Sequence, residues 1–284
     1  MTAILKYFSL VKFSHTIFAL PFAFIGFTLA IKEGYTFTTE QLVLMLVCMV
    51  TARNAAMAFN RYIDRKFDAL NPRTAIREIP AGLIKPQNAL YFIIFNCLLF
   101  IVATYLINPI CFYLSPVALF VVLFYSYTKR FTPLCHLVLG CGLALAPIGA
   151  YLVLSAQFAW LPILFSFTVL TWVSGFDIIY ALQDEQFDRA HQLNSIPVLL
   201  GTKGALRFSE FLHLISVTCV ILAGIYGNFN FIYWIGVAIF SALIIYQHAI
   251  VKPNDLSRVN LAFGTTNGIA SFIFACFTIT SFFI

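Results

Sequence analysis

Oxygen-bearing side chains recur every four residues just after a long apolar stretch of the chain. They are Asn60, Asp64 and Asp68. In a helix this spacing turns each side chain only ~40° from the one before, so all three lie along one face. Amide and carboxylate oxygens without His or Cys partners suit a hard cation such as Mg²⁺, which usually completes its octahedron with water and substrate phosphates. The pattern therefore predicts a magnesium site whose substrate is a diphosphate.

A second run of carboxylates closes another apolar stretch. Seven and then four residues separate Asp177, Asp184 and Asp188, so a helix would place these three on one face as well. An aspartate at the centre of a membrane helix costs ~2.5–3.5 kcal/mol. A solvated helix end explains one such cluster, but it explains two with matched spacing poorly. We therefore expect the two clusters to face each other across a shared pocket and to hold one metal-bound diphosphate.

Basic side chains that suit a diphosphate occur near both clusters. Arg73 and Arg77 follow the first cluster, and the spacing of four between Tyr125 and Lys129 puts a hydroxyl and an ammonium on one helical edge. Such donors stabilise the charge that develops on a departing phosphate. Arg130 is better interpreted as an anchor at the membrane surface.

Arg53 lies on the same predicted helix face as Asn60 but deeper in the apolar stretch. A guanidinium group can bind both oxygens of a carboxylate. A buried Arg53 would therefore suit an aromatic acid.

The composition indicates which solvent surrounds these clusters. Hydrophobic residues make up 61% of the 284 and charged residues only 10%, whereas a soluble domain averages ~45–50% and ~25%. A surface so poor in charge does not keep a protein of this size in water, so the bilayer is the solvent. The net charge of +6 does not indicate nucleic-acid binding, because the basic residues are scattered between apolar segments.

A spanning helix needs ~20 mostly apolar residues, and the chain offers nine such stretches. A break at Asn108-Pro109 divides the third from the fourth. Only the connections at about 60–87 and 184–207 are long. The nine predicted spans are 14–31, 41–59, 88–107, 110–127, 134–155, 159–180, 208–226, 229–249 and 261–283.

Positive charges gather in alternate connections, and the remaining connections hold only Lys32. This bias predicts a cytoplasmic N-terminus, cytoplasmic long loops and an outer C-terminus, which requires an odd number of spans. We expect a single polytopic domain over 1–284 in the inner (cytoplasmic) membrane.

The order and spacing of these motifs resemble the UbiA superfamily of intramembrane aromatic prenyltransferases. The resemblance rests on an NxxxDxxxD pattern from Asn60, a YxxxK pattern from Tyr125, and a DxxxD pattern from Asp184. A further Asp and a Tyr-Ala-x-Gln segment, Tyr180 to Gln183, precede the last pattern. Together these motifs cover essentially the whole chain.

Two further segments are similar to the bacterial branch that resembles 4-hydroxybenzoate polyprenyltransferase. They are Arg-Asn-Ala-Ala-Met-Ala-Phe-Asn from Arg53 and the stretch 71–82. Glu78 stands where many relatives have Pro, which leaves the acceptor open.

The resemblance implies an all-α integral membrane fold, with nine transmembrane helices in a horseshoe around a central cavity. It implies Mg²⁺-dependent transfer of a polyprenyl group from a polyprenyl diphosphate to the ring of an aromatic acid, such as 4-hydroxybenzoate, in quinone biosynthesis. It implies no obligate protein partner.

Roles for individual residues follow from the resemblance by position. Two Mg²⁺ would be held by Asn60, Asp64, Asp68, Asp184 and Asp188. The diphosphate would be bound by Arg73, Arg77, Tyr125 and Lys129, and the catalytic set would be the four aspartates Asp64, Asp68, Asp184 and Asp188 with Lys129. Arg53 would orient the acceptor with Asp177 or Asp184 nearby, and Tyr180 and Gln183 would contact substrate.

Two other interpretations stay open. The same chemistry on a dihydroxynaphthoate-type acid would serve menaquinone synthesis. A polytopic secondary transporter would also carry intramembrane carboxylates, but it predicts them near the bilayer midplane rather than at helix ends beside basic loops.

The five histidines form no metal-ligand spacing. His15 opens the first span and faces either the cavity or the membrane interface. Asn267 in the last span is equally ambiguous.

Overall fold

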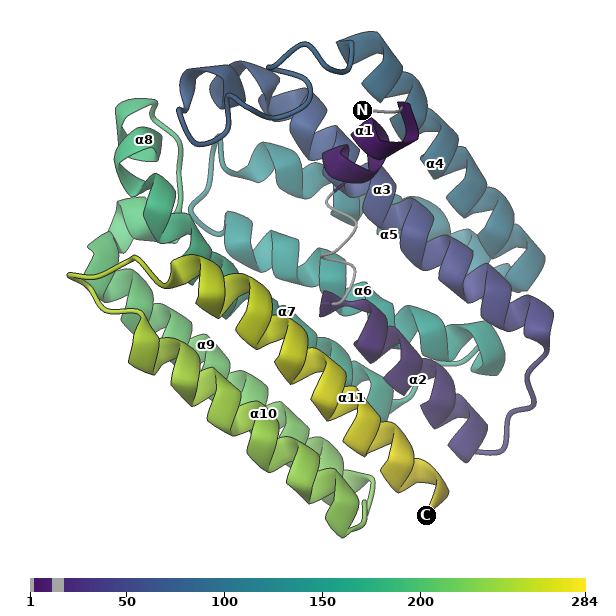
Figure 1. The fold of residues 1–284 in the computed structure, drawn as a ribbon. Coiled ribbons are helices and arrows are strands. Elements are labelled where there is room, and N and C mark those ends of the chain that lie inside the picture. Colours follow the sequence, from purple (N-terminus) through teal and green to yellow (C-terminus); the bar gives the residue numbers. More distant parts are fainter. Residues whose placement is uncertain (1–2, 12–17) are drawn as a thin grey trace. The chain divides into compact units, whose positions relative to one another are not determined.

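The computed structural model describes residues 3–11 and 18–284, and this part of the chain forms helices and no β-strand (Figure 1). The helices fall into two compact units. The first unit contains residues 3–11 and 39–127, and the second contains residues 18–38 and 128–284. His15 lies outside the described residues.

The first unit is built on one long helix. Helix α3 (Thr39–Leu70) packs along α4 (Pro86–Ile107), and the short α1 (Ala3–Leu10) contacts α3. Helix α5 (Pro109–Thr128) follows α4 directly. The break between α4 and α5 falls at Asn108, as predicted, because a residue before proline avoids the helical region. The Asn108 side chain accepts a hydrogen bond from the Cys111 backbone at 2.9 Å and so caps the new helix.

The second unit packs its helices around a centre rich in aromatic rings. Helix α6 lies against both α2 and α7, α7 also lies against α9, and α10 pairs with α11. Buried rings of Phe22, Phe165, Trp172, Phe240 and Phe274 form the middle of this core. The elements are α2 (Leu20–Lys32), α6 (Cys135–Ser155), α7 (Trp160–Ala181), the 3₁₀ turn η2 (Leu182–Asp184), α8 (Glu185–Ala190), α9 (Ile196–Tyr226), α10 (Phe231–Ile250), the π-helical turn η3 (Leu261–Thr266) and α11 (Asn267–Phe283).

Glycines let α6 approach its neighbours closely. A Cβ atom on Gly26 of α2 would lie 2.0 Å from the Pro147 carbonyl oxygen, and one on Gly140 would lie 2.3 Å from the Ser174 Oγ. Small residues at helix contacts are the usual means of tight packing in membranes. The α6–α7 contact matters most here, because α7 leads into the second aspartate cluster.

The chain is a multi-pass membrane protein. Eight helices in the described residues are long and apolar enough to span a bilayer, and they correspond to eight of the nine predicted stretches. The first predicted span, 14–31, is described only from residue 18, and α2, which overlaps it, has 13 residues. The prediction of nine spanning helices is therefore met for eight.

The predicted long connections are partly helical. Helix α3 continues to Leu70 and has 32 residues, about 48 Å of helix, against a hydrocarbon core of ~30 Å. Helix α9 begins at Ile196, well before the predicted 208, and bends at Gly201, whose φ is 65°. Hydropathy predicts only the part of a helix that lies in lipid. The helix itself can continue through the charged residues that follow, and the prediction by hydropathy does not include them.

Asn267 has a structural role within the second unit. Its side-chain oxygen accepts hydrogen bonds from Trp172 Nε1 at 3.1 Å and from Gln247 Nε2 at 2.6 Å. Its amide nitrogen donates to the carbonyls of Ala262 and Phe263 in the π-helical turn. Asn267 thus ties the π-helical turn to α7 and α10.

Candidate functional site

The first aspartate cluster lies near the C-terminal end of α3. The helix runs without interruption through Asn60, Asp64 and Asp68, as predicted, so the three share one face. The Asn60 amide donates to Asp64 Oδ2 at 3.0 Å. That bond uses the amide nitrogen and leaves the Asn60 side-chain oxygen out of it.

Asp68 is buried and forms an ion pair with Arg77 across the following turn. The Arg77 Nη1 lies 2.6 Å from Asp68 Oδ1. The other carboxylate oxygen of Asp68 is buried and has no hydrogen-bond partner within residues 3–11 and 18–284. A buried acceptor left in this state is costly, and a cation at this position would remove the cost.

The connection 71–85 folds back on α3 and so brings Arg77 to Asp68. The Thr74 hydroxyl donates to the Asp68 carbonyl at 3.0 Å, and the Asn71 side chain accepts from the Arg73 backbone at 3.0 Å. Gly82 ends the turn with a φ of 72°, which glycine adopts without a steric cost. The predicted phosphate ligands Arg73 and Arg77 therefore lie on a loop whose conformation is held by hydrogen bonds.

Glu78 links this loop to the N-terminal helix. It is buried, and the Ser9 hydroxyl of α1 donates to its Oε1. The buried Arg61 guanidinium lies within electrostatic range of Glu78 and Asp68. Sequence reasoning treated Arg61 only as one of the positive charges of the loop, because nothing in its spacing indicates that it points into the protein.

Arg53 also contacts the N-terminal segment. Its Nη1 donates to the Val11 carbonyl at 2.8 Å, just after the end of α1. Tyr125 of α5 lies close enough to Arg53 and Arg61 to interact electrostatically with both. The first unit thus brings Arg53, Tyr125 and the first cluster together.

The second cluster spans a change in helix type. Helix α7 ends at Ala181, and Asp184 closes the 3₁₀ turn before α8 begins. The three aspartates are therefore not carried by one regular α-helix, which the prediction of a shared face assumed. The Gln183 side chain donates to the Tyr180 carbonyl at 3.2 Å, and it competes there with the helical backbone bond.

Lys129 and Asp188 form an ion pair in the second unit. The Lys129 Nζ lies 2.8 Å from Asp188 Oδ2, without the geometry of a directed hydrogen bond. Burial by itself would lower the pKa of the Lys129 ammonium, but the adjacent Asp188 carboxylate raises this pKa above its ordinary value. The Lys129 carbonyl accepts from the Asn194 backbone at 2.7 Å, which fixes the segment that carries the ammonium.

Sequence reasoning missed the partner of Asp177. The His136 Nδ1 of α6 lies 2.7 Å from Asp177 Oδ2. Spacing could not reveal this pair, because the two residues come from different helices. The same limitation applies to His213 of α9 and His248 of α10, where His213 Nδ1 lies 2.8 Å from His248 Nε2.

Aromatic rings line the helix that carries Asp177. Tyr180 stacks on Phe263 with ring centroids 4.2 Å apart, and Phe176 meets Phe263 edge to face at 5.4 Å. The 5.4 Å separation is ordinary for interacting aromatic rings, and the stacked pair is closer still. The predicted substrate residue Tyr180 therefore belongs to an aromatic wall.

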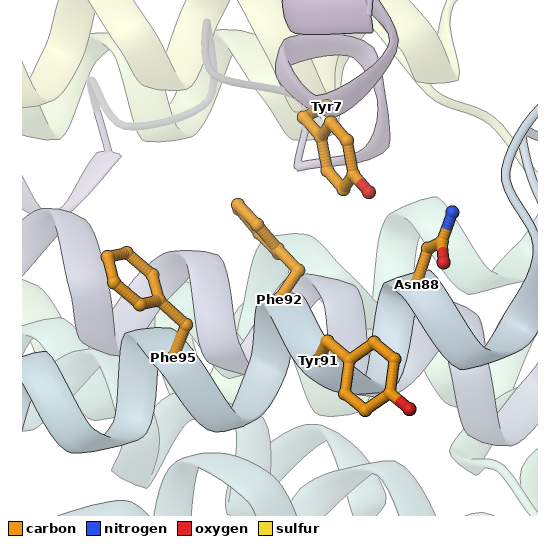
Figure 2. A pocket seen from close by; sticks show the side chains of 5 residues that line it. All are labelled: Tyr7, Asn88, Tyr91, Phe92 and Phe95. Carbon is orange, nitrogen blue, oxygen red and sulfur yellow. The ribbon is translucent and has the colours of Figure 1, made fainter.

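An open hollow of about 330 Å³ also lies in the first unit, between α1 and α4. Figure 2 shows Tyr7 above Phe92, with Asn88, Tyr91 and Phe95 around them. The Tyr7 and Phe92 rings are 4.9 Å apart. None of the predicted site residues lines this hollow, so it is separate from the aspartate clusters.

The oxygen donors fit a magnesium ion that shares its coordination with substrate. Among the described residues, no three His, Cys, Asp or Glu side chains form a ready metal-binding group. Mg²⁺ is typically bound by one or two carboxylates together with phosphate oxygens and water. The paired aspartates, with the unpartnered oxygen of Asp68, meet that requirement.

Comparison with known proteins agrees with this chemistry. The sequence profile of the UbiA prenyltransferase family matches residues 19–277. A 4-hydroxybenzoate octaprenyltransferase of Francisella tularensis subsp. novicida is 28% identical over 236 residues, which is 82% of each chain.

Solved structures share the fold. A UbiA homologue from Aeropyrum pernix superposes with a TM-score of 0.85 at 34% identity, over 94% of this chain and 97% of the other. A UbiA homologue from Archaeoglobus fulgidus, solved with GPP and Mg²⁺, superposes with a TM-score of 0.71 at 21% identity, over 98% of this chain and 100% of the other.

Proposed function

We propose that this chain, which belongs to the UbiA prenyltransferase family, transfers a polyprenyl group from a polyprenyl diphosphate to the ring of an aromatic hydroxy acid. The acceptor that we favour is 4-hydroxybenzoate, because the Francisella relative carries this activity in its name. The Archaeoglobus protein, solved with GPP and Mg²⁺, supports a diphosphate donor and a magnesium requirement.

One observation carries the proposal, namely a repeated arrangement in the two units. In each, an aspartate pair closes a long apolar helix, and a basic side chain neutralises the distal aspartate. The pairs are Asp68 with Arg77 at 2.6 Å and Asp188 with Lys129 at 2.8 Å. Adjacent acidic and basic groups of this kind suit a metal-bound diphosphate, since the carboxylates take the metal and the cations take phosphate oxygens.

We assign binding of the prenyl diphosphate to the two clusters. Asn60, Asp64, Asp68, Asp184 and Asp188 would hold two Mg²⁺, which when bound would offset the charge of the diphosphate. Arg73, Arg77, Tyr125 and Lys129 would bind its oxygens and stabilise the charge that develops as the allylic C–O bond breaks. The apolar helices would bind the isoprenoid tail and keep water from the cation.

The acceptor end falls to Arg53 and the aromatic wall. The Arg53 guanidinium, anchored by the Val11 carbonyl, would bind the carboxylate of the acid. Tyr180, which stacks on Phe263, would contact the aromatic ring, with Gln183 and Asp177 beside it. The ring carbon next to the hydroxyl would attack the allylic carbon.

The membrane setting follows from the charge pattern. We place the N-terminus and the connections that carry the site on the cytoplasmic side of the inner membrane, because the basic residues gather in those connections. The carboxylates of the first cluster lie near the end of α3 rather than at its middle. That position disfavours a transporter.

An assay with purified protein tests the proposal. The protein in detergent receives GPP or farnesyl diphosphate, Mg²⁺, and either 4-hydroxybenzoate or 1,4-dihydroxy-2-naphthoate, and products are identified by mass spectrometry. We expect a prenylated acid from the wild type and from Asp255→Asn, an exposed control outside the site. Loss of product is expected for Asp64→Asn, whereas full activity of that variant would refute the metal assignment. The preferred acid distinguishes the two acceptors.

A double substitution tests whether both clusters act on one diphosphate. Residues that act as a unit show strongly non-additive effects on kcat. We therefore expect the Asp64→Asn/Asp184→Asn variant to be about as slow as the slower single variant. Effects that multiply would indicate two independent sites.

A further inference from the structure

A buried histidine and a half-buried aspartate form a pair that the diphosphate chemistry does not use. His136 begins α6 and Asp177 lies near the end of α7, with Nδ1 and Oδ2 2.7 Å apart. The His136 side chain is 4% exposed and the Asp177 side chain 21%. The pair therefore presents its carboxylate, and not its imidazole, to whatever binds beside α7.

The surrounding packing holds the pair rigidly. The Ser174 hydroxyl donates to the His136 carbonyl at 3.1 Å, which ties α7 to the start of α6. One turn further along α6, Gly140 allows Ser174 to approach so closely that a Cβ atom would not fit. These contacts hold together the two helix segments that carry His136 and Asp177.

Each member of the pair has one atom without a partner in the described chain. Asp177 Oδ2 is bound to His136, and no described residue donates to its second oxygen. The His136 Nε2 is buried and unpaired. The buried imidazole contacts the Asp177 carboxylate through Nδ1. We therefore interpret His136 as the group that orients Asp177.

The pair borders the second cluster. Cys135, the residue before His136, lies within electrostatic range of both His136 and Lys129. Tyr180 stands three residues after Asp177, and its ring stacks on Phe263. The pair therefore lies next to the segment that carries Lys129, and Asp177 lies about one helical turn from Tyr180 of the aromatic wall.

We propose that Asp177 accepts the hydroxyl proton of the aromatic acceptor and that His136 is the positioning residue that aims its carboxylate. This inference rests on the proposed function. The His136 contact occupies only Oδ2 of Asp177, which leaves Oδ1 to accept the proton.

The step balances as follows. The C–O bond of the allylic diphosphate breaks, and its electron pair leaves with the diphosphate. The acceptor O–H bond breaks as the proton passes to Asp177, and a C–C bond forms between the allylic carbon and the ring carbon next to the oxygen. The ring then loses its C–H proton to the departing diphosphate, and the proton on Asp177 returns to the oxygen. The products are the prenylated acid and protonated diphosphate.

The test compares two acceptors in one variant. 4-Hydroxybenzoate needs a base, whereas 3-fluoro-4-hydroxybenzoate has a more acidic hydroxyl and needs it less. General-base catalysis contributes ~10²–10⁴-fold, so we expect Asp177→Asn to lower kcat about 100-fold with the first acid and much less with the second. The ratio of the two rates does not depend on how much of the variant is folded.

His136 is tested with a matched pair of substitutions. His136→Asn keeps an N–H donor near the Nδ1 position, whereas His136→Leu removes it. We expect the leucine variant to show the same acid-dependent loss as Asp177→Asn and the asparagine variant to recover most of kcat.

The outcomes separate this inference from the proposed function. Equal losses with both acids, or full activity of Asp177→Asn, would overturn the role of Asp177 while leaving prenyl transfer intact. An asparagine variant as impaired as the leucine variant would overturn the role of His136. A wild type that consumes no prenyl diphosphate would overturn both proposals.

Discussion

The Lys129 ammonium lies 2.8 Å from a carboxylate oxygen of the buried Asp188. The lysine comes from the segment after α5, the aspartate from α8, and the Asn194 backbone holds the lysine carbonyl. This pair links two parts of the second unit that are far apart in sequence. The adjacent carboxylate also favours the charged form of the Lys129 ammonium.

Removal of one member of this pair should reduce stability, and removal of both should restore it. Lys129→Met leaves the Asp188 carboxylate buried without its partner. We expect a loss of about 1–3 kcal/mol, which is less than the ~3–5 kcal/mol for fully buried pairs, since the Lys129 side chain is 33% exposed. Lys129→Met/Asp188→Asn should recover the thermal midpoint in detergent but not prenyl transfer. A double variant as unstable as the single would contradict the pairing.

Removal of divalent metal should abolish prenyl transfer. We expect EDTA to stop product formation and Mg²⁺ to restore it. Asp68→Asn replaces the carboxylate that we assign to the metal with a neutral amide. The Mg²⁺ concentration for half-maximal activity should therefore rise, by roughly 10–100-fold as for other groups around metal sites. The control Asp255→Asn should match the wild type. An unchanged Mg²⁺ requirement in the Asp68 variant would remove Asp68 from the site.

Sequence patterns predicted what depends on neighbours along one helix. The spacing of Asn60, Asp64 and Asp68 required only that α3 be continuous, and it is. The break at Asn108 required only that proline follow it. Such features depend on local geometry, which the sequence contains directly.

Contacts between helices were not predictable in the same way. His136 and Asp177 are in contact where α6 and α7 pack closely, at Gly140 and Ser174. The spacing of residues within one helix cannot predict a contact with another helix. The 3₁₀ turn at Asp184 was not predicted either; there the Gln183 side chain donates to the Tyr180 carbonyl. A residue pattern indicates which face a side chain occupies, but packing decides what that face meets.

The bond between Ser9 and Glu78 should stabilise the first unit. Glu78 is buried, and one of its oxygens has no partner in the part of the chain that the structure describes. Ser9→Ala removes the hydroxyl that donates to Glu78 Oε1, and an unsatisfied buried acceptor costs ~1–3 kcal/mol. We expect a lower thermal midpoint and a higher KM for the prenyl diphosphate, because the same loop carries Arg77.

A threonine at position 9 keeps the hydroxyl and serves as the matched control. Ser9→Thr should behave like the wild type in both measurements. If Ser9→Ala left the thermal midpoint and KM unchanged, the contact between α1 and the loop would have no energetic role.

Two glycines of the same helix provide a sharp test of the α6–α7 packing. A Cβ atom on Gly140 would lie 2.3 Å from the Ser174 Oγ and 2.5 Å from the Leu170 carbonyl oxygen, whereas one on Gly149 would meet nothing within 4 Å. Overpacking of this kind typically costs ~1–3 kcal/mol. Alanine in an open helical position instead adds ~0.5–1 kcal/mol of stability relative to glycine.

Gly140→Ala should therefore lower the thermal midpoint in detergent, and Gly149→Ala should leave it unchanged or raise it. Gly140→Ala should also have a lower kcat at temperatures where it remains folded, because separation of α6 from α7 would move His136 away from Asp177. Gly140→Ala/Ser174→Ala removes the hydroxyl clash but keeps the backbone clash with Leu170, so we expect only partial recovery. Equal behaviour of the two glycine variants would show that the close approach of α6 and α7 contributes neither to stability nor to the geometry of the pair.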